Sequence, residues 1–477
     1  MLESLKTKTV NGVFWSSVER FSVQAIQFTI SLLIARVLTP ADYGVIGMLA
    51  IFMALSQTFI DSGFSNALIR KTNRTEVDNS TVFYFNIAVG LLFYALLYFA
   101  APAIAQFYDT PILIPITRVL ALGIIFNSLA IVQRALLTIR VDFKTQAKAS
   151  LTAALLSGAV GLWMAYSGFG IWALAVQTIL NGFLNTVMLW VLTQWRPLWV
   201  FSWSSFRELF SFGSKLLASG LIDTIYNNVY TIVIGKIFSA GELGYYSKAK
   251  EFSQIPSSNI QGIVGRVTYP ILCELQDDDE RLRQVYRRYL RLSAYLTFPL
   301  MIGLAALASP LITVLLTDKW VAAVLLLQIL CFAMMWYPIH AINLNLLQVK
   351  GRTDLFLRLE ILKKIVGVSI LCVTIPLGVA WMCVGSVVSS IVCLAINTHY
   401  TGVLIQLGFL KQMRDLLPAL FYSLSMGALV YLVMEFVDGN LLKLGVGTLV
   451  GVLYYVGISL ATRSAEFKDV FSLIRKK

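Results

Sequence analysis

The chain has 477 residues, of which 58% are hydrophobic and only 13% are charged, and its mean hydropathy is +0.76. Soluble domains carry about 45–50% apolar and about 25% charged residues, so the composition argues against two or three soluble domains. The net charge is +13. Such a charge can indicate nucleic-acid binding or an excess of basic residues on one side of a membrane, and the positions of the charges distinguish the two.

Long stretches of the chain carry no charge at all. Residues 149–195, 292–317, 320–349 and 365–410 contain no Asp, Glu, Lys or Arg. A helix that crosses a bilayer needs about 20 mainly apolar residues, and the short alternating segments of a membrane β-barrel are absent from the sequence. We therefore predict an all-α polytopic membrane protein.

Charged residues and clusters of Gly and Pro divide the chain into about fourteen predicted transmembrane helices. They lie near residues 12–35, 43–65, 81–105, 113–139, 149–167, 171–193, 209–235, 243–272, 289–315, 320–348, 357–377, 380–405, 414–436 and 440–462. The predicted helix at 243–272 is interrupted by Lys248, Lys250 and Arg266.

Most Lys and Arg residues fall on one side of these predicted helices. With the N-terminus inside, the inner segments hold 25 of them, whereas the outer segments hold only Arg36, Lys236, Lys319 and Lys443. Because cytoplasmic loops keep an excess of positive charge, we expect both ends of the chain to be cytoplasmic. This topology accounts for most of the net charge, so no nucleic-acid partner is expected. The largest inner loop, about 273–288, contains the run ELQDDDERLRQVYRR and is interpreted as solvated.

The segment IARVLTPADYG at 34–44 has a counterpart 200 residues later, IGKIFSAGELG at 234–244. Arg36 matches Lys236, Thr39 matches Ser239, Asp42 matches Glu242 and Gly44 matches Gly244, whereas Ala240 stands in place of Pro40. Six predicted helices separate the two segments, so they predict a parallel repeat with a pseudo-two-fold axis along the membrane normal. We expect an N-terminal lobe at 1–208, a C-terminal lobe at 209–410, and two extra helices with a cytoplasmic tail at 411–477.

Several charges lie inside the predicted helices, where a charge at the bilayer centre costs at least about 2.5–3.5 kcal/mol, so such residues usually face a cavity or a partner. The basic ones are Arg20, Arg118, Arg134, Lys215, Lys248, Lys250, Arg266, Lys363 and Lys364. The acidic ones are Glu19, Asp61, Asp223, Glu251 and Glu360. Since the bases outnumber the acids, we expect a net-positive cavity that attracts phosphate or another anion. Arg118 near the outer interface and snorkelling Lys363 and Lys364 are the alternatives for single residues.

Polar side chains recur at helical spacing on the first two predicted helices of each half. The stripes are Ser16, Arg20, Gln24, Gln27 and Ser31; Gln57, Asp61 and Ser65; Lys215, Ser219, Asp223, Asn227 and Tyr230; and Lys250, Gln254, Ser258 and Gln261. The candidates for lining a substrate cavity are Arg20, Gln24, Gln27, Arg134, Lys215, Asn227, Lys250 and Arg266. Asp61 and Asp223 are candidates for charge balance or for a coupling ion, and a structural salt bridge explains them equally well.

No metal site and no cofactor are expected. The chain has only two histidines, His340 and His399, too few for a His-based metal or catalytic cluster. The five cysteines include no CxxC motif and are interpreted as small buried side chains.

The segment from Phe14 to Arg70 resembles the N-terminal region of Wzx-type bacterial polysaccharide flippases, in the multidrug/oligosaccharidyl-lipid/polysaccharide exporter superfamily. One shared element is R-x-L-x-P-x-[DE]-[YF]-G, present as Arg36, Leu38, Pro40, Asp42, Tyr43 and Gly44. The other is the turn Asp61-Ser62-Gly63-Phe64. The length, the number of predicted helices and the two-lobe repeat agree with this family along the whole chain.

The resemblance implies a flippase in the bacterial inner membrane that moves undecaprenyl-diphosphate-linked oligosaccharides from the cytoplasmic to the periplasmic leaflet. The flipped oligosaccharides serve the synthesis of lipopolysaccharide O-antigen, capsule or exopolysaccharide. The implied mechanism is alternating access by two lobes around a cationic cavity, with Arg20, Arg134, Lys215 and Arg266 as candidates for the diphosphate. The expected partners are the lipid-linked substrate, membrane lipids, a coupling ion (H⁺ or Na⁺) and a polysaccharide polymerase.

Three other functions are weighed against this one. A multidrug exporter of the same superfamily should have an acidic or aromatic cavity, which the excess of bases argues against. A lipid II flippase also needs a basic cavity and stays open, although the motif at 34–44 favours the polysaccharide branch. A membrane polymerase or ligase should carry a large charged outer loop, which is not predicted here, and no nucleophile–base pair stands out. We therefore expect a transporter and no enzyme.

Overall fold

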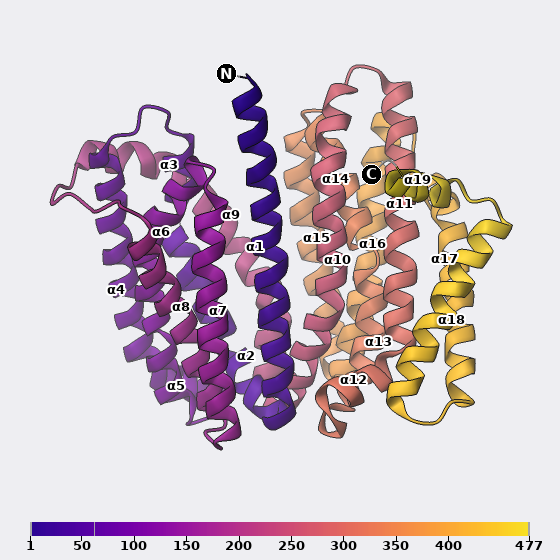
Figure 1. Cartoon of the computed structure of the whole chain (residues 1–477), viewed down its shortest axis with the longest axis horizontal. Coiled ribbons are helices and arrows are strands. Elements are labelled where there is room, and N and C mark those ends of the chain that lie inside the picture. Colours follow the sequence, from indigo (N-terminus) through magenta and orange to yellow (C-terminus); the bar gives the residue numbers. More distant parts are fainter. Residues whose placement is uncertain (1, 62, 476–477) are drawn as a thin grey trace. The chain divides into compact units, whose positions relative to one another are not determined.

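Helix is the only regular secondary structure in the part of the chain that the structure describes (Figure 1). This computed structural model describes residues 2–61 and 63–475, and their side chains except those of 2–14, Phe212, Lys215, Thr353 and 471–475. A backbone in hydrocarbon must satisfy its own hydrogen bonds, and a helix does so within one segment. Ten helical segments of the described chain are long and apolar enough to cross a membrane.

The chain divides into two compact units, residues 1–244 (unit 1) and 245–477 (unit 2). Unit 1 contains α1 (Leu2–Val37), α2 (Pro40–Asp61), α3 (Phe64–Arg70), α4 (Glu76–Phe107), α5 (Leu113–Leu120), α6 (Leu122–Ile139), α7 (Phe143–Tyr166), α8 (Ile171–Leu192) and α9 (Trp203–Ile237). The helix α10 (Ala240–Glu274) begins at the end of unit 1 and continues into unit 2. Unit 2 then contains α11 (Asp279–Ala306), α12 (Ala308–Leu316), α13 (Ala323–Met334), α14 (Tyr337–Val349), α15 (Thr353–Thr374), α16 (Val379–Ile405), α17 (Phe409–Glu435), α18 (Asn440–Ala461) and α19 (Ala465–Arg475). The predicted lobe boundaries at 208 and 410 stay a prediction.

Each predicted transmembrane helix coincides with one or two of these elements. Ten of the predictions correspond to the segments that are apolar enough to cross a membrane. The other four, at 12–35, 209–235, 243–272 and 357–377, fall on α1, α9, α10 and α15. These helices are long enough, but they carry most of the charges that lie inside the predicted helices. Charge, not length, therefore sets them apart, and their membrane crossing stays a prediction.

Small residues allow the helices of unit 1 to approach closely. Both α1 and α8 pack against α7. The buried face of α7 is made of Ala147, Ala149, Ala153, Ala154, Ser157, Gly158, Gly161 and Ala165. A Cβ atom on Gly158 would overlap the side chain of Ile30 on α1. Such faces of small residues promote helix association in membranes by close packing, because the hydrophobic effect does not drive helices together in lipid.

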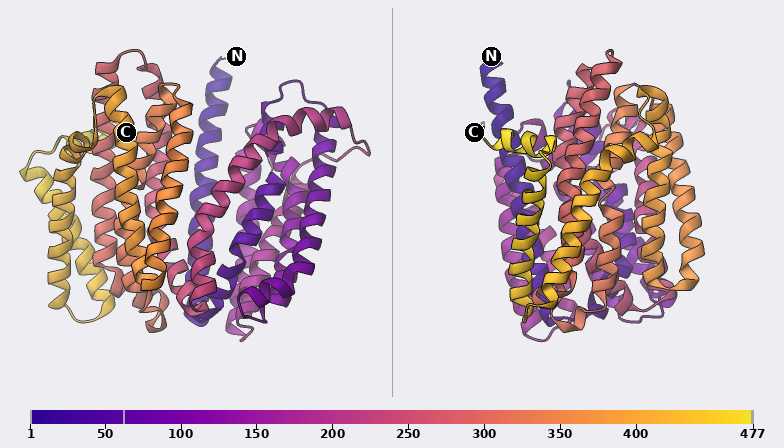
Figure 2. Two further views of the ribbon diagram at one scale, coloured as in Figure 1. Left: turned by 180° about the vertical axis from the view of Figure 1, so that it is seen from behind. Right: turned by 90° about the vertical axis from the view of Figure 1, so that its right-hand side faces the viewer.

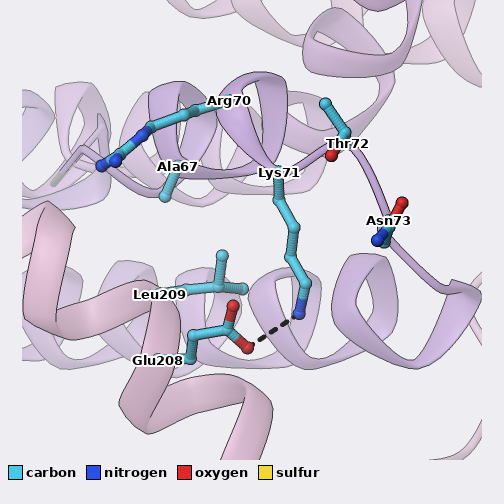
Figure 3. A pocket seen from close by; sticks show the side chains of 7 residues that line it. All are labelled: Ala67, Arg70, Lys71, Thr72, Asn73, Glu208 and Leu209. Carbon is cyan, nitrogen blue, oxygen red and sulfur yellow. Dashed lines mark hydrogen bonds and ion pairs between the residues drawn. The ribbon is translucent and has the colours of Figure 1, made fainter.

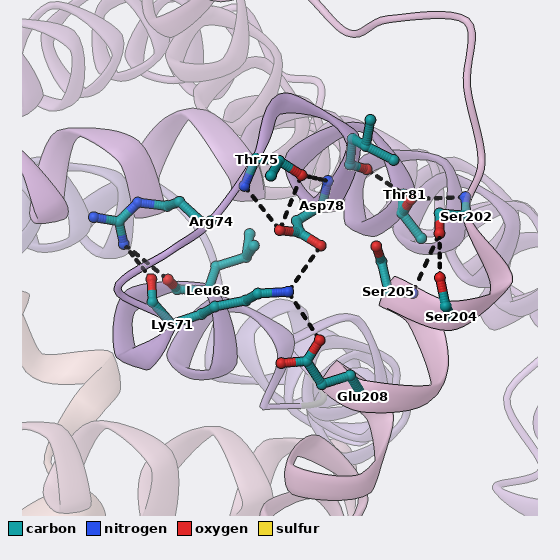
Figure 4. A network of polar contacts seen from close by, with 11 residues as sticks. Leu68, Lys71, Arg74, Thr75, Asp78, Thr81, Ser202, Ser204, Ser205 and Glu208 are labelled. Atoms are coloured by element: carbon teal, nitrogen blue, oxygen red, sulfur yellow. Dashed lines mark hydrogen bonds and ion pairs between the residues drawn. The ribbon is translucent and has the colours of Figure 1, made fainter.

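A polar network closes the end of unit 1 where α3, α4 and α9 meet (Figure 4). Lys71 Nζ lies 3.1 Å from Asp78 Oδ1 and 2.9 Å from Glu208 Oε2. The hydrogen bond to Glu208 raises the pKa of Lys71, so this base stays charged and is neutralised by two carboxylates. Figure 3 shows the neighbouring pocket of about 400 Å³, in which Lys71 points toward Glu208.

Buried polar side chains join the helices of unit 2. Thr401 Oγ1 donates a hydrogen bond to Asn343 Oδ1 at 2.8 Å, and Gln412 Nε2 donates to the same oxygen at 3.0 Å. Tyr295, where α11 packs on α17 and α18, donates from its hydroxyl to Ser459 Oγ at 2.7 Å. Such hydrogen bonds contribute roughly 0.6–2 kcal/mol each in membrane proteins.

The interpretation of residues 273–288 as a solvated loop is wrong for its second half. α11 begins at Asp279, and Asp278 caps it by accepting a hydrogen bond from Arg281 N. Arg287 pairs with Asp415 of α17, and Arg288 pairs with Asp469 of α19, a short helix that lies across the first half of α11 (Figures 1 and 2). These partners are 128 and 181 residues away in the sequence, so no local pattern could indicate them.

The repeated segments 34–44 and 234–244 form the same local structure. α1 and α9 end at Val37 and Ile237, and α2 and α10 begin at Pro40 and Ala240. Each new helix is capped by a hydroxyl, because Asp42 N donates to Thr39 Oγ1 at 3.3 Å and Glu242 N donates to Ser239 Oγ at 3.1 Å. In the second family element, α2 ends at Asp61 and α3 begins at Phe64, and Ser62 lies outside the described residues.

The two repeated turns also touch each other, and the residues in contact all belong to unit 1. A Cβ atom on Gly44 would overlap the carbonyl oxygen of Ala240, and a Cβ atom on Gly244 would overlap the carbonyl oxygen of Pro40. The contact is reciprocal, as a two-fold relation between the turns requires. Glycine is the residue that permits such a close approach of two backbones.

Gly44→Ala should lower the stability of the protein, because the added methyl group meets a backbone carbonyl rather than a movable side chain. Overpacking costs about 1–3 kcal/mol. Gly123→Ala is the matched control, since nothing lies within 4 Å of a Cβ atom there and alanine gains about 0.5–1 kcal/mol over glycine in a helix. Thermal unfolding of the detergent-purified variants measures the difference. A melting temperature of Gly44→Ala equal to that of the unaltered protein would contradict the reciprocal contact.

Candidate functional site

The polar stripe of α1 opens onto a pocket of about 390 Å³ in unit 1. Its lining comes from Ser16, Glu19, Arg20, Val23, Gln24 and Gln27 of α1 and from Ser150 of α7. The structure thus brings three of the predicted candidates, Arg20, Gln24 and Gln27, to one pocket. Arg20 and Gln27 are exposed, and Gln24 is half-buried.

Arg134 is attracted by two carboxylates that come from other helices. It is half-buried on α6, and its charge interacts with Glu19 of α1 and with Asp61 of α2. Ser150 Oγ donates a hydrogen bond to Glu19 Oε1 at 3.0 Å, and Gln57 Nε2 donates to Asp61 Oδ1 at 3.0 Å. Glu19 therefore connects the α1 pocket to Arg134.

The guanidinium of Arg134 keeps hydrogen-bonding capacity for a ligand. Within the described part of the chain it makes no hydrogen bond, and neither Glu19 nor Asp61 lies within 4.0 Å of it. A guanidinium presents five N–H donors in a planar fork that matches phosphate oxygens. The two carboxylates thus attract Arg134 from more than 4.0 Å away, and no close ion pair with a described residue occupies its donors.

The cluster contains as many acids as bases, Glu19 and Asp61 against Arg20 and Arg134. The expected excess of positive charge therefore does not arise within this cluster. Arg20 is exposed, and it makes no salt bridge with any described residue. It is the base of the cluster best placed to meet an incoming anion, whereas an anion at Arg134 must compete with two carboxylates.

The candidates on α9 lie on one helical face of unit 1. Asp223 and Asn227 are one turn apart and exposed. Neither of them lines the pocket on α1. The predicted candidate Lys215 also falls on α9, but its side chain lies outside the described ones.

The two candidates in unit 2 lie on α10. Lys250 is half-buried, with its Nζ 6.0 Å from the centre of the Tyr246 ring, and Arg266 is exposed further along the helix. Lys248, which was not selected as a candidate, is 2% exposed and forms an ion pair with Glu251 at 2.8 Å. A buried base with a carboxylate one turn away forms a structural ion pair.

Other bases of the predicted helices also have local partners. The Arg118 guanidinium lies 4.4 Å from the centre of the Tyr98 ring, and its Nε donates to the carbonyl oxygen of Tyr98. Lys363 pairs with Glu360 on the same helix. By contrast, sequence reasoning missed Ser150, because the predicted helix at 149–167 contains no charge that marks it as part of a site.

The histidine and cysteine side chains of the described chain do not assemble into a metal site. His340 Nε2 lies 3.0 Å from Ser390 Oγ, and His340 Nδ1 lies 3.1 Å from Asn397 Nδ2, so the neighbouring helix α16 holds both ring nitrogens. Among the described residues no group of three or more His, Cys, Asp or Glu could hold a metal ion.

Comparison with known proteins identifies the family. A model of the family described as "Polysaccharide biosynthesis protein" matches residues 33–325. The chain is 28% identical over 356 residues to the teichuronic acid biosynthesis protein TuaB of Bacillus subtilis (strain 168), with 74% of each chain covered. It is 24% identical over 366 residues to the lipopolysaccharide biosynthesis protein WzxC of Escherichia coli (strain K12), covering 76% of this chain and 74% of that one. It is also 25% identical over 324 residues to the succinoglycan biosynthesis transport protein ExoT of Rhizobium meliloti (strain 1021), covering 68% and 66%.

Solved structures share the fold. The lipid II flippase MurJ in its inward closed conformation superposes with a TM-score of 0.79 at 16% identity, covering 94% of this chain and 98% of MurJ. An inward-facing multidrug resistance MATE family transporter superposes with a TM-score of 0.63 at 16% identity, covering 82% of this chain and 99% of that one. At such identities the likeness concerns the fold alone. The resemblance read from residues 14–70 is thus confirmed, and the chain belongs to the polysaccharide biosynthesis protein family as a Wzx-like multi-pass membrane transporter with a MurJ- and MATE-like fold, not as an enzyme.

Proposed function

We propose that the protein flips undecaprenyl-diphosphate-linked oligosaccharides from the cytoplasmic to the periplasmic leaflet of a bacterial inner membrane. The product serves the synthesis of lipopolysaccharide O-antigen, capsule or exopolysaccharide. The observation that carries the proposal is the α1 pocket, where the exposed Arg20 adjoins the half-buried Arg134, a base with unfilled donors. The names of the relatives, which refer to several different surface polysaccharides and to transport, support a glycan cargo.

The diphosphate is the part of such a substrate that the pocket recognises. It carries more than one negative charge, and hydrogen bonds between guanidinium and phosphate are about twice as strong as neutral ones. Arg20 makes the first contact because it is exposed, and Arg134 adds a second when the diphosphate replaces its attraction to the carboxylates. Gln24 and Gln27 line the same pocket, and their amides both donate and accept, which suits sugar hydroxyls.

The carboxylates of the cluster supply a route for coupling. While the substrate is absent, Glu19 and Asp61 offset the charge of Arg134. A diphosphate at Arg134 removes that attraction, and a carboxylate without its counter-charge takes up a proton or Na⁺ more readily. Asp61 is our candidate for the coupling ion, and Asp223 of α9 is a second candidate.

The proposal includes the topology and the mechanism expected for this family. About fourteen transmembrane helices form two six-helix lobes related by a pseudo-two-fold axis, followed by two extra helices, with both chain ends in the cytoplasm. Transport proceeds by alternating access. Lys215, Lys250 and Arg266 are further basic candidates for substrate contact and Asn227 is a neutral polar one, and a polysaccharide polymerase receives the flipped oligosaccharide. The like orientation and like capping of the turns at 39–42 and 239–242 support the repeat.

Lipid II transport is the nearest alternative, because the MurJ likeness extends over nearly the whole chain. That likeness concerns the fold, whereas the family match and the names of the relatives favour surface polysaccharide. Complementation separates the two functions. We expect the gene to restore surface polysaccharide in a strain that lacks its polysaccharide flippase, and not to restore growth in a strain depleted of its lipid II flippase.

Arg20→Ala should reduce export strongly, because the pocket loses its exposed guanidinium. A hydrogen bond to a charged group contributes about 1.5–3 kcal/mol, so we expect roughly a 10- to 100-fold loss of apparent affinity. Surface polysaccharide in the complemented strain, measured at matched low levels of the protein in the membrane, reports the loss. Arg118→Ala is the matched control, since that base stacks on Tyr98, and it should leave export unchanged. Full export by Arg20→Ala would exclude this pocket as the diphosphate site.

Arg134 tests whether the cluster binds substrate or only holds the helices together. Arg134→Gln leaves two carboxylates without their counter-charge, so it should lower both the melting temperature and export. Adding Asp61→Asn and Glu19→Gln removes those charges and should restore the melting temperature, because replacing a whole buried charged group is often neutral for stability. Export should stay low in this triple variant if Arg134 contacts the diphosphate. Recovery of export together with stability would show that Arg134 is a structural residue.

A further inference from the structure

A second basic pocket, separate from the α1 pocket, lies in unit 2 and plays no part in the function proposed above. It encloses about 660 Å³ where the start of α11, the turn between α16 and α17, and the start of α17 meet. Its basic lining residues are Arg283, Arg287, Arg291, Lys411 and Arg414. The three arginines of α11 are spaced four residues apart, so they share one face of that helix.

Two of these bases are neutralised within the pocket. Arg287 forms a bidentate ion pair with Asp415, at 2.7 Å from Nε and 2.6 Å from the terminal nitrogen. Asp415 is only 8% exposed, so this pair joins α11 to α17 and is structural. Arg283 pairs with Glu280, one turn earlier on α11.

The other three bases leave an excess of positive charge. Lys411 Nζ donates to the backbone carbonyl of Gln406 at 3.0 Å, which does not cancel its charge. Arg291 is the exception, because its Nε forms an ion pair at 3.4 Å with Glu466 of α19, a carboxylate that does not line the pocket. Arg414 is exposed and makes no salt bridge with any residue that the structure describes. The pocket thus offers the donors of Lys411 and Arg414 to an anion.

The surroundings of Arg414 indicate that this anion belongs to a lipid. Leu410, Arg414, Leu417 and Phe421 follow one another at steps of three and four residues, so they share a face of α17. The three apolar side chains are 81%, 56% and 66% exposed. On a helix apolar enough to cross a membrane, large exposed apolar side chains face acyl chains. The charged pocket therefore continues into an apolar, lipid-facing strip of α17. A lipid can cover this strip with its acyl chains, whereas a soluble phosphate cannot.

The level of the pocket in the membrane agrees with a headgroup. α19 lies across the first half of α11 (Figures 1 and 2), where Arg288 and Arg291 pair with Asp469 and Glu466. Phe467 and Val470 of α19 pack on the core of α11, α17 and α18. A short helix with one polar and one apolar face, lying across the transmembrane helices, is typical of the membrane interface. Basic pockets between transmembrane helices at that level bind anionic lipid headgroups.

We propose that this pocket binds the phosphate of an anionic phospholipid, whose acyl chains lie along the face of α17 that carries Leu417 and Phe421. The charge bias of the loops predicts that this lipid comes from the cytoplasmic leaflet. Bound there, it bridges α11 and α17 beside the Arg287–Asp415 ion pair and stabilises the folded state by mass action. The site does not depend on the identity of the transported glycan.

The test uses the full-length protein, purified in detergent and stripped of lipid. Native mass spectrometry measures binding of dioleoylphosphatidylglycerol, with dioleoylphosphatidylcholine as the neutral lipid of equal chain length. We expect phosphatidylglycerol to bind and to raise the melting temperature of the protein. Phosphatidylcholine should neither bind nor change the melting temperature. Lys411→Gln with Arg414→Gln should weaken binding of the anionic lipid about tenfold or more, since two basic residues that face the headgroup are lost.

The matched control is Arg281→Gln. Arg281 lies on the same turns of α11, is 76% exposed and does not line the pocket, so this variant should bind the lipid like the unaltered protein. If the double variant does not fold, Arg414→Gln alone replaces it, because Arg414 takes part in no salt bridge of the described chain, and a fewfold loss is expected. Unchanged lipid binding by a folded variant would overturn the proposal. Binding of inorganic phosphate that is equally tight, and that Lys411→Gln with Arg414→Gln weakens to the same extent, would overturn the assignment to a lipid.

Discussion

A charged side chain inside a membrane helix needs a counter-charge, a hydrogen-bond partner or water, and this need sorts the bases of the chain into two groups. Lys248 has Glu251, Lys363 has Glu360, and Arg118 has the Tyr98 ring and carbonyl. These partners lie close by in each case, and the bases serve the structure. Arg134 is attracted by two carboxylates without a close ion pair, and Arg20 is exposed at a pocket. The second group retains the capacity to bind a ligand.

Because a charge in a membrane helix needs a partner, the helices that carry many charges are candidates for ligand binding. α1, α9, α10 and α15 are long but too charged to count among the segments that composition alone marks as membrane-crossing. A helix that only filled the bilayer would lose little by replacing such charges with apolar residues. In α1 the polar residues instead form one face, Ser16 to Gln27, that lines a pocket. We therefore propose that the charge kept in α1 serves binding.

Much of this arrangement could be predicted from local sequence patterns. Helical spacing placed Arg20, Gln24 and Gln27 on one face, and the repeated segments indicated two turns with the same capping hydroxyls at Thr39 and Ser239. Features that depend on distant contacts could not be predicted. Ser150 lies 131 residues from Glu19, and Asp415 lies 128 residues from Arg287. The reciprocal contact of Gly44 and Gly244 was also hidden, although the glycines themselves were visible in the repeat.

The fold does not decide what is transported, since MurJ and a MATE transporter share it at 16% identity. The side chains in the pocket must do so, and we propose that here they bind the diphosphate. Transport by the full-length protein in liposomes tests this most directly, using a fluorescent polyprenyl-diphosphate-linked sugar and the same polyprenyl-linked sugar without the diphosphate. We predict that the protein speeds the passage of the first lipid between leaflets and not of the second. Equal acceleration of both lipids would contradict recognition of the diphosphate by the arginines of the α1 pocket.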